Sequence, residues 1–148
     1  MKVVIQRVKH AHVKVDNQLV ARIQKGFLLL VGIAENDDKK QIEKFVRKIT
    51  QMRIFEDENA KMNRSLQEVG GAILSISQFT LYADCKKGNR PSFIKAAKSE
   101  HAQALYDMLN AQLKATGMKV ETGVFGAHME IDLCNDGPTT IILDSEEL

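Results

Sequence analysis

Apolar and polar residues alternate along much of the first part of the chain, which is the pattern of strands with one buried face. Residues 3–8 are rich in β-branched side chains and residues 11–16 alternate, so each segment predicts a strand. Residues 19–23 follow turn residues at 16–17 and complete a predicted hairpin. Residues 26–34 contain a continuous apolar run, which predicts a strand covered on both faces, with a buried helix as the alternative.

Two later segments have the helical period instead. The first places apolar residues at i, i+3, i+4 and i+7 after a potential cap at Asn36 or Asp37, and its charged residues predict a solvated outer face. The second begins with Ser99 as a potential cap and ends near Gly117. The apolar stripes of the two predicted helices are Ile42, Phe45, Val46 and Ile49, and Ala102, Leu105, Leu109 and Leu113.

The remaining apolar runs are short and predict strands. They comprise residues 53–55, 72–81, 120–124, 129–133 and 140–143, with polar turns or loops at 56–63 and 84–92. Roughly eight short strands and two substantial helices predict a mixed, β-rich α/β fold, in which hairpin-containing sheets are covered by two main helices. Because no stretch has the composition of a linker, residues 1–148 are expected to form one domain.

The charge of the chain is nearly balanced, with 21 Lys and Arg residues against 19 Asp and Glu residues and a formal net charge of +2. This balance is too mild to indicate a nucleic-acid-binding protein by itself. Any contact with RNA must therefore come from shape or from a local basic group. One candidate is the predicted loop with Lys86, Lys87 and Arg90, which is either an ordinary solvated loop or a set of phosphate contacts.

Cysteine and histidine do not occur at the spacings of metal ligands, so no metal and no cofactor is expected. Cys85 and Cys134 lie far apart in the sequence and are expected to be reduced thiols, although a disulfide stays an alternative. The apolar run at the start is too short for a signal peptide, and no run approaches the length of a membrane span. We therefore expect a cytoplasmic protein that makes no contact with a membrane.

Polar side chains interrupt the second apolar run at Ser77, Gln78 and Thr80. Thr80 could be a nucleophile, but no base is close to it in the sequence, and the alternative is a strand threonine bonded to the backbone. The chain also has no GxSxG motif, which argues against a hydrolase triad. Ser77 and Gln78 predict the rim of a pocket whose backbone N–H groups could bind an oxyanion.

Residues 135–140 read Asn-Asp-Gly-Pro-Thr-Thr and lie between two predicted strands. By composition alone, this segment predicts a tight turn. Gly137 tolerates unusual backbone angles and Pro138 has no N–H to donate, so the pair could instead aim carbonyl oxygens at a small ligand. The composition leaves both interpretations open.

Phe125 lies close to two glycines, Gly123 and Gly126, which is unusual in a regular strand and suggests a bulge or a close approach. Phe125 and Met129 are either core residues or part of a surface on which a base can stack. His128 alternates with Met129 and is expected to be exposed.

Five stretches of the chain match, in order, the signature of one family. They are Gln6-Arg7-Val8, Ser77-Gln78-Phe79-Thr80-Leu81, Gly88-Asn89-Arg90-Pro91-Ser92-Phe93, Gly123-Val124-Phe125-Gly126-Ala127-His128-Met129 and Asn135-Asp136-Gly137-Pro138-Thr139-Thr140. From end to end, the chain resembles bacterial D-aminoacyl-tRNA deacylases of the D-tyrosyl-tRNA deacylase family. The resemblance implies a three-layer α/β/β fold and hydrolysis of the ester between a D-amino acid and the terminal ribose of tRNA. It also implies a homodimer with two pockets at the interface.

The resemblance further implies roles for individual residues. The Gly137-Pro138 bond would be cis, and this turn would enter the partner's pocket, hold the amino group, and crowd an L side chain; Arg7 would brace it. Glycine has no side chain to reject, so glycyl-tRNA would also be hydrolysed. The implied catalytic residues are Ser77, Gln78, Phe79 and Thr80, and those lining the site for the terminal adenosine are Ala102, Phe125 and Met129. Thr80 is either a nucleophile or a positioning group, because the family is also described as using main-chain groups and the 2′-hydroxyl of the substrate.

Two other functions are compatible with the residues. A nucleic-acid-binding module would bind RNA or DNA in a salt-dependent way without cleaving an ester. A small-molecule D-amino ester hydrolase or amidase would act on free esters and would not require tRNA.

Overall fold

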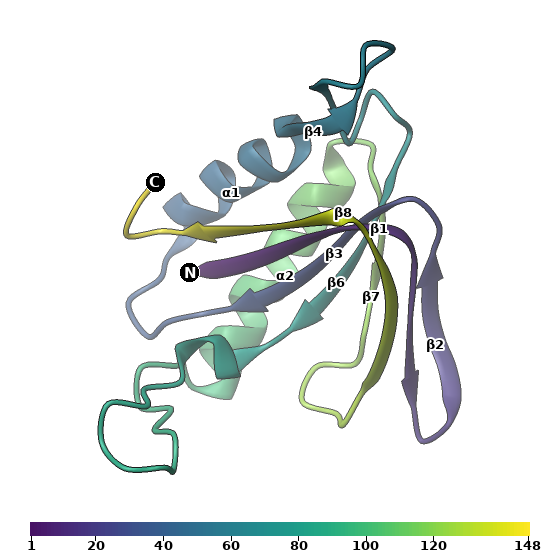
Figure 1. Ribbon diagram of the computed structural model, residues 1–148. Coiled ribbons are helices and arrows are strands. Elements are labelled where there is room, and N and C mark those ends of the chain that lie inside the picture. Colours follow the sequence, from purple (N-terminus) through teal and green to yellow (C-terminus); the bar gives the residue numbers. More distant parts are fainter.

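The computed structural model describes residues 1–148 and contains eight strands, two α-helices and one short 3₁₀-helix (Figure 1). In chain order they are β1 (Lys2–Val15), β2 (Gln18–Ile23), β3 (Gly26–Gly32), α1 (Lys39–Gln51), β4 (Arg53–Glu56), β5 (Met62–Ser65), β6 (Ala72–Ser77), η1 (Phe79–Tyr82), α2 (Ser99–Ala115), β7 (Lys119–Thr122) and β8 (Glu130–Asp144). The predicted mixed, β-rich α/β fold with two main helices is confirmed. Neither helix has the length and apolar character that would let it cross a membrane.

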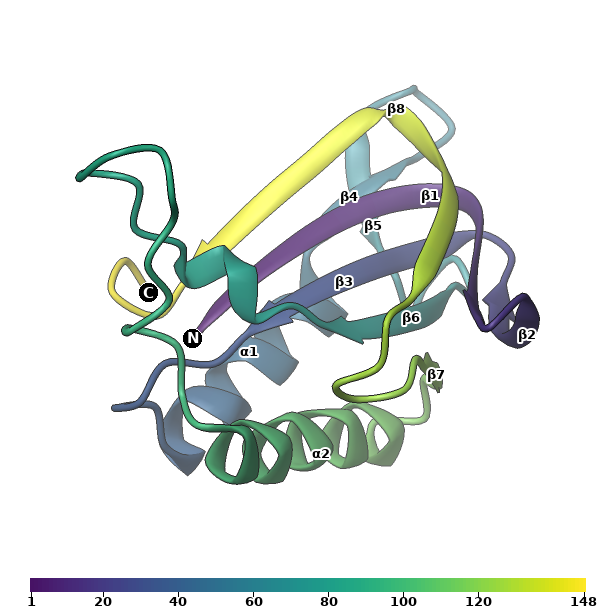
Figure 2. The ribbon, with the colours of Figure 1, turned by 90° about the horizontal axis from the view of Figure 1, so that it is seen from below.

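The main sheet has the order β2-β1-β3-β6-β7, and β8 pairs with the other edge of β1. The pairs of β1 with β2, β3 and β8 are antiparallel, whereas β3 pairs in parallel with β6, and β6 with β7. Parallel neighbours need a crossover connection, and α1 and α2 lie in these two connections. Both helices consequently cover the same face of the sheet (Figure 2).

Side chains of β3 point alternately to two separate cores, which confirms that this strand is buried on both faces. Phe27 and Leu29 pack with the two helices in the larger core. Leu28 packs in a second core, between β3 and β6 and the curled part of the sheet formed by β2 and the distal parts of β1 and β8. The helices, the central strands and the curled strands therefore form the expected three layers.

Two predicted pairs of short strands are each one long strand in the structure. Segments 3–8 and 11–16 are continuous in β1, and segments 129–133 and 140–143 are continuous in β8. The tight turn proposed for residues 135–140 is therefore wrong. In the β1–β8 pairing, Gln6 faces Thr140 and Val8 faces Asn135, so the residues between them on β8 form a bulge opposite Arg7. A bulge tolerates Pro138 because it requires no ladder N–H.

The predicted strand 72–81 ends earlier than expected. Ser77, its last strand residue, pairs with Val31 near the end of β3, so the chain beyond Ser77 has no ladder partner. It turns instead into η1, which contains Phe79 and Thr80. A further difference is β5, which begins in the segment predicted to be only a polar turn.

The predicted helix caps lie one residue or more from the observed ones. Asp38 caps α1 in a capping box with Gln41, whereas the carboxylate of Asp37 binds other groups. Lys98 is the N-cap residue of α2, and Ser99 is its first residue. Gly117 follows the end of α2 with a φ of +88°, as expected for a glycine that terminates a helix.

Candidate active site

A cavity of about 600 Å³ opens where β3 and β6 end, against the first turn of α2 and the connection from β7 to β8. Its volume lies within the range of small-molecule sites. Six residues that the sequence analysis singled out line it: Ser77, Gln78, Phe79, Ala102, Phe125 and Met129. Residues distant in the sequence therefore converge on one mostly apolar cavity with a polar edge.

Thr80 lies beside this cavity in η1 and is exposed, so the interpretation of Thr80 as a strand residue is wrong. Its hydroxyl accepts a hydrogen bond from the side-chain amide of Gln78 at 2.5 Å. The backbone N–H of Gln78 donates to Val31 O at 2.7 Å, which anchors the start of η1 to β3. An amide is not a base, so this contact orients the Thr80 hydroxyl without activating it as a nucleophile.

The mouth of the cavity carries an exposed aromatic pair. Phe79 is 54% exposed and Phe93 is 37% exposed, and their rings meet edge to face with centroids 5.1 Å apart. Exposed aromatic faces of this kind are suited to stacking on a nucleobase. Deeper in the site, Phe125 packs against Tyr106 of α2 at a centroid distance of 6.0 Å.

Arg7 is hydrogen-bonded to the residue that precedes the Gly137-Pro138 segment. Arg7 is 5% exposed; its Nε donates to Asp136 O at 3.0 Å and its Nη1 donates to Ile54 O at 2.6 Å. The peptide bond before Pro138 is cis. Gly137 has a φ of +132°, and a Cβ there would lie 2.5 Å from Thr139 Oγ1, so only glycine fits without displacement.

The Gly137-Pro138 segment does not reach the cavity of its own chain. Neither residue lines the cavity, and both are exposed. Arg7 pairs with Phe27, whereas the cavity begins at Val31, four residues further along β3 and roughly 13 Å away at the usual strand rise. The structure therefore separates the predicted site residues into two groups.

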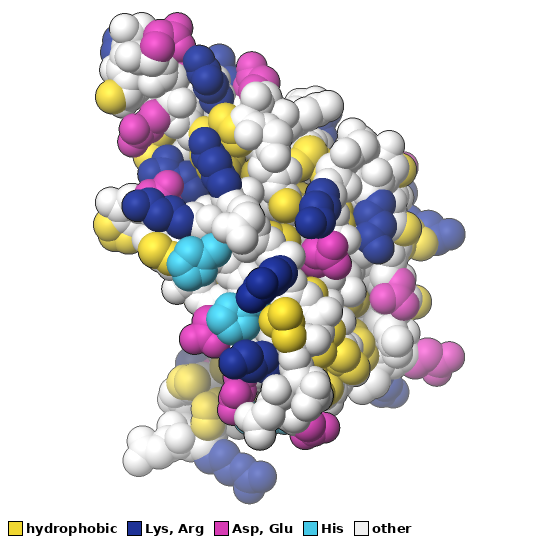
Figure 3. Space-filling model, turned by 90° about the vertical axis from the view of Figure 1, so that its right-hand side faces the viewer, with side chains coloured by type: hydrophobic (Ala, Val, Ile, Leu, Met, Phe, Trp, Pro, Cys, Tyr) yellow, Lys and Arg dark blue, Asp and Glu magenta, His cyan; other side chains and the backbone are white.

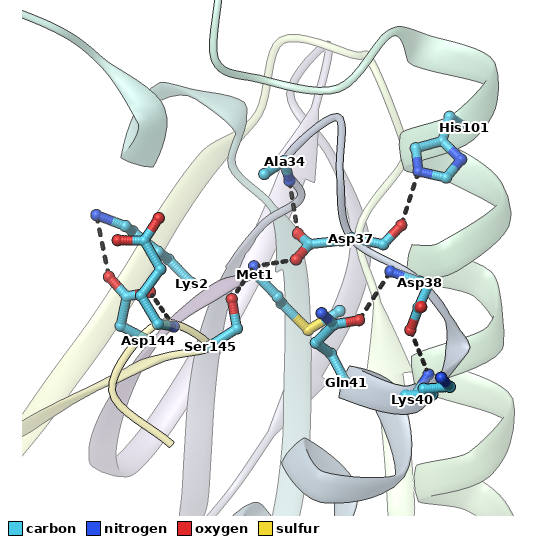
Figure 4. Close-up of polar contacts among 11 residues, drawn as sticks. Met1, Lys2, Ala34, Asp37, Asp38, Lys40, Gln41, His101, Asp144 and Ser145 are labelled. Carbon is cyan, nitrogen blue, oxygen red and sulfur yellow. Dashed lines mark hydrogen bonds and ion pairs between the residues drawn. The ribbon is translucent and has the colours of Figure 1, made fainter.

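A buried ion pair fixes the wall of the cavity formed by residues 96–102 (Figure 4). The α-ammonium group of Met1 contacts the Asp37 carboxylate and donates to Ser145 Oγ at 2.7 Å, and Asp37 also accepts from the Ala34 N–H at 2.7 Å. The Asp37 carbonyl accepts from His101 Nε2 at 3.0 Å. Residues 33–37 are thus tied both to the N-terminus and to the first turn of α2.

Lys86, Lys87 and Arg90 are exposed, in the loop between Phe79 and Phe93, two residues that line the cavity. Backbone hydrogen bonds of 2.8 and 2.9 Å between Asp84 and Ser92 close the loop. The Lys86 N–H and the nearby ammonium groups of Lys95 and Lys86 hold the pKa of Asp84 below its usual value. The loop therefore presents basic side chains to solvent, and none of the three lines the cavity.

Elsewhere the surface charges are mixed. On the face shown in Figure 3, Lys and Arg side chains are interspersed with Asp and Glu side chains. No group of three or more His, Cys, Asp or Glu side chains could hold a metal ion, and Cys85 and Cys134 are free.

Comparison with known proteins identifies the family of this chain. The family model described as D-Tyr-tRNA(Tyr) deacylase matches residues 4–144. The chain belongs to this family. A D-aminoacyl-tRNA deacylase of Limosilactobacillus reuteri (strain DSM 20016) is 58% identical over 144 residues, 97% of this chain and 99% of that protein. One from Thermus aquaticus is 54% identical over 147 residues, 99% of this chain and 97% of that protein.

Two solved structures are also similar. One, described as c-Myc DNA Unwinding Element Binding Protein, has a TM-score of 0.92 at 40% identity and covers 98% of this chain and 99% of that chain. The other, described as a probable eukaryotic D-amino acid tRNA deacylase, has a TM-score of 0.82 at 19% identity and covers 96% of this chain and 97% of that chain. The second comparison concerns the fold alone.

In this member of the D-Tyr-tRNA(Tyr) deacylase family, the cavity is also lined by four polar or aromatic residues that the sequence did not predict to be there. They are Phe93, Lys98, Ser99 and His128. Phe93 and His128 lie in two of the five matching stretches, which was the available signal. His128 is exposed, as predicted, but it also borders the cavity. Lys98 and Ser99 carry no sequence signal beyond the start of a helix.

Proposed function

We propose that this chain, acting as one domain of residues 1–148 in the cytoplasm, hydrolyses the ester between a D-amino acid and the terminal ribose of tRNA. The observation that carries the proposal is the convergence of Ser77, Gln78, Phe79, Ala102, Phe125 and Met129 on a single cavity. Family membership supports the same reaction. Ala102, Phe125 and Met129 bind the terminal adenosine, and the ester lies at the end formed by residues 77–79.

In this proposal, catalysis relies on positioning. Thr80 and the backbone at Gln78 and Phe79 hold the ester and its attacking water, and the 2′-hydroxyl of the substrate assists. The hydrogen bond from the Gln78 amide to Thr80 Oγ1 supports a positioning role, since it supplies no base. Lys86, Lys87 and Arg90 contact tRNA phosphates, which adds affinity without sequence specificity.

We also propose that two copies form a homodimer in which the Gly137-Pro138 segment of each enters the pocket of the other. Its exposure and its separation from the cavity of its own chain support this arrangement. A two-fold axis would then complete both sites at once. The carbonyl groups of this rigid segment would hold the substrate amino group and exclude an L side chain, while D-amino acids and glycine fit.

An exposed apolar row beside this segment supports the dimer. Val4 pairs with Leu30 on one side and with Ile142 on the other, on the sheet face opposite the helices. Ile142 is 66% exposed, and the other two side chains are only partly buried. A contiguous apolar row of this kind is typical of a surface that another chain covers.

The deciding experiment compares D-tyrosyl-, L-tyrosyl- and glycyl-tRNA as substrates of the purified protein. Loss of the D and glycyl esters, with the L ester intact, is expected. Cleavage of the L ester at a similar rate would remove the proposed chiral filter. Sedimentation of the same sample measures the dimer independently, and a monomer with full chiral selectivity would exclude the shared pocket.

A second candidate function is binding of nucleic acid without catalysis. The 40% identical structure described as c-Myc DNA Unwinding Element Binding Protein is the observation that favours it. It predicts salt-dependent binding of DNA or RNA by a folded protein that cleaves no ester. A small-molecule D-amino ester hydrolase would instead cleave free D-tyrosine esters as fast as the tRNA ester.

A further inference from the structure

The side chain of Asn135 spans the bulge that β8 forms opposite Arg7. Its Oδ1 accepts a hydrogen bond from the Thr139 N–H at 2.9 Å. Its Nδ2 donates in two longer contacts, to Thr139 O at 3.4 Å and to Thr140 Oγ1 at 3.3 Å. One carboxamide group therefore binds both backbone polar groups of Thr139, at the far end of the bulge.

These contacts take the place of strand pairing that the bulge interrupts. On β8, the residues between Asn135 and Thr140 lie opposite Arg7 alone, so the regular ladder with β1 is broken there. Thr139 is 7% exposed, and a buried N–H without an acceptor is costly. Asn135 supplies that acceptor from within the same strand.

Gly137 lies between the two side chains at the ends of this arrangement. A Cβ at Gly137 would lie 2.5 Å from Thr139 Oγ1 and 3.0 Å from Arg7 Nη2, so both side chains pack directly against this residue. Arg7 binds the residue before Gly137, through Asp136 O, and Asn135 binds the residue two positions after it. Different side chains therefore hold the two ends of the segment.

We propose that Asn135 is a positioning residue for the Gly137-Pro138 segment, and thereby for discrimination between D- and L-aminoacyl esters; this inference rests on the proposed function. Arg7 holds only the first end of the bulge, and Pro138 has no N–H through which β1 could hold the rest. The contacts of Asn135 fix the second end before substrate binds. The backbone carbonyls then have one orientation, which rejection of an L side chain by the backbone requires.

The test compares Asn135→Ala with the wild type in deacylation of D-tyrosyl- and L-tyrosyl-tRNA by the intact protein. A general loss of folded enzyme lowers both values of kcat/KM equally, whereas a displaced segment lowers the D value and raises the L value. We expect the D-to-L ratio to fall by at least about tenfold, the equivalent of one hydrogen bond. Asn135→Asp covers the case in which the alanine variant does not fold: it is isosteric but has no N–H to donate to Thr139 O, so its ratio should also fall.

Asn63→Ala is the matched control. Asn63 also uses its side chain in a hydrogen bond, donating to Asp57 Oδ2 at 2.6 Å, but it does so at an exposed position of β5. Its D-to-L ratio should equal that of the wild type. A fall of the same size in Asn63→Ala would overturn the proposal, because the effect would then not be specific to the bulge.

Hydrogen exchange of the Thr139 amide, measured without substrate, tests the contact itself. This amide should exchange at least about tenfold faster in Asn135→Ala than in the wild type. An unchanged D-to-L ratio in the folded Asn135 variants, or unchanged exchange at Thr139, would overturn the proposal. If the wild type cleaved neither ester, faster exchange at Thr139 would still support the role of Asn135 in holding the segment, and that outcome would reject only the proposed function.

Discussion

Replacing Arg7 with lysine tests whether this residue positions the Gly137-Pro138 segment. The guanidinium reaches two carbonyl oxygens on different segments, Asp136 O at 3.0 Å and Ile54 O at 2.6 Å. A lysine ammonium is a compact point charge and cannot reproduce this fork, so one of the two hydrogen bonds is lost. A hydrogen bond to a charged group contributes about 1.5–3 kcal/mol, and the unfolding free energy should fall by about this amount.

The same loss should appear in activity, because the segment completes the pocket of the partner in the proposed dimer. About 1.4 kcal/mol corresponds to a tenfold change, so kcat/KM for D-tyrosyl-tRNA should fall by about 10- to 100-fold in Arg7→Lys. The assays are urea denaturation at fixed protein concentration and deacylation of D- and L-tyrosyl-tRNA. Arg22→Lys, on an exposed position of β2, is the matched control. Reduced stability with unchanged kcat/KM and unchanged rejection of the L ester would refute the positioning role of Arg7.

Three further substitutions test other parts of the molecule. Thr80→Ala should keep the single-turnover rate within about tenfold of the wild type, because Thr80 is proposed to position the ester and not to attack it. Loss of a true nucleophile would lower the rate by a factor on the order of 10⁶. Asp37→Asn should lower the unfolding free energy by about 3–5 kcal/mol in urea, because it leaves the buried Met1 ammonium without its counter-charge. Glu68→Gln should lower the melting temperature at pH 7 but not in acid. The Ser65 N–H and hydroxyl lower the pKa of Glu68 below 4.5, so this stabilisation exists above pH 4.5 and is lost as the pH falls through the folded-state pKa.

Each of these expectations has a control and an opposing result. A collapse of single-turnover activity in a folded Thr80→Ala protein would restore Thr80 as the nucleophile. Asp38→Asn, at the neighbouring exposed cap, should cost far less than Asp37→Asn, and equal losses would contradict the buried pair. A melting difference between Glu68→Gln and wild type that persists below the folded-state pKa would show that the carboxylate charge is not its cause.

The spacing of apolar residues along the sequence predicted burial correctly where these residues recur with a regular period. The apolar stripe of α1 and the continuous apolar run of β3 predicted their burial correctly, since both depend on side chains a few residues apart. The same logic failed for residues 135–140, whose composition is that of a turn. Only the long pairing of β1 with β8 makes them a bulge, with Arg7 opposite them.

The sequence by itself determined the fold class, the two helices and six of the 18 residues that line the cavity. Five of these six lie in the matching stretches, which carry family information that no single residue has. Only the tertiary structure decided which of the predicted site residues lie at the cavity and which lie away from it. The parallel pairing of β3 and β6 ends at Ser77, where the cavity opens. The bulge in β8 instead places Gly137 and Pro138 opposite Arg7 of β1, which pairs with Phe27 near the start of β3, outside that cavity. Strand pairing brings together residues that are more than a hundred positions apart in the chain. The local sequence pattern does not determine this pairing, because its register is set only when the whole sheet has formed.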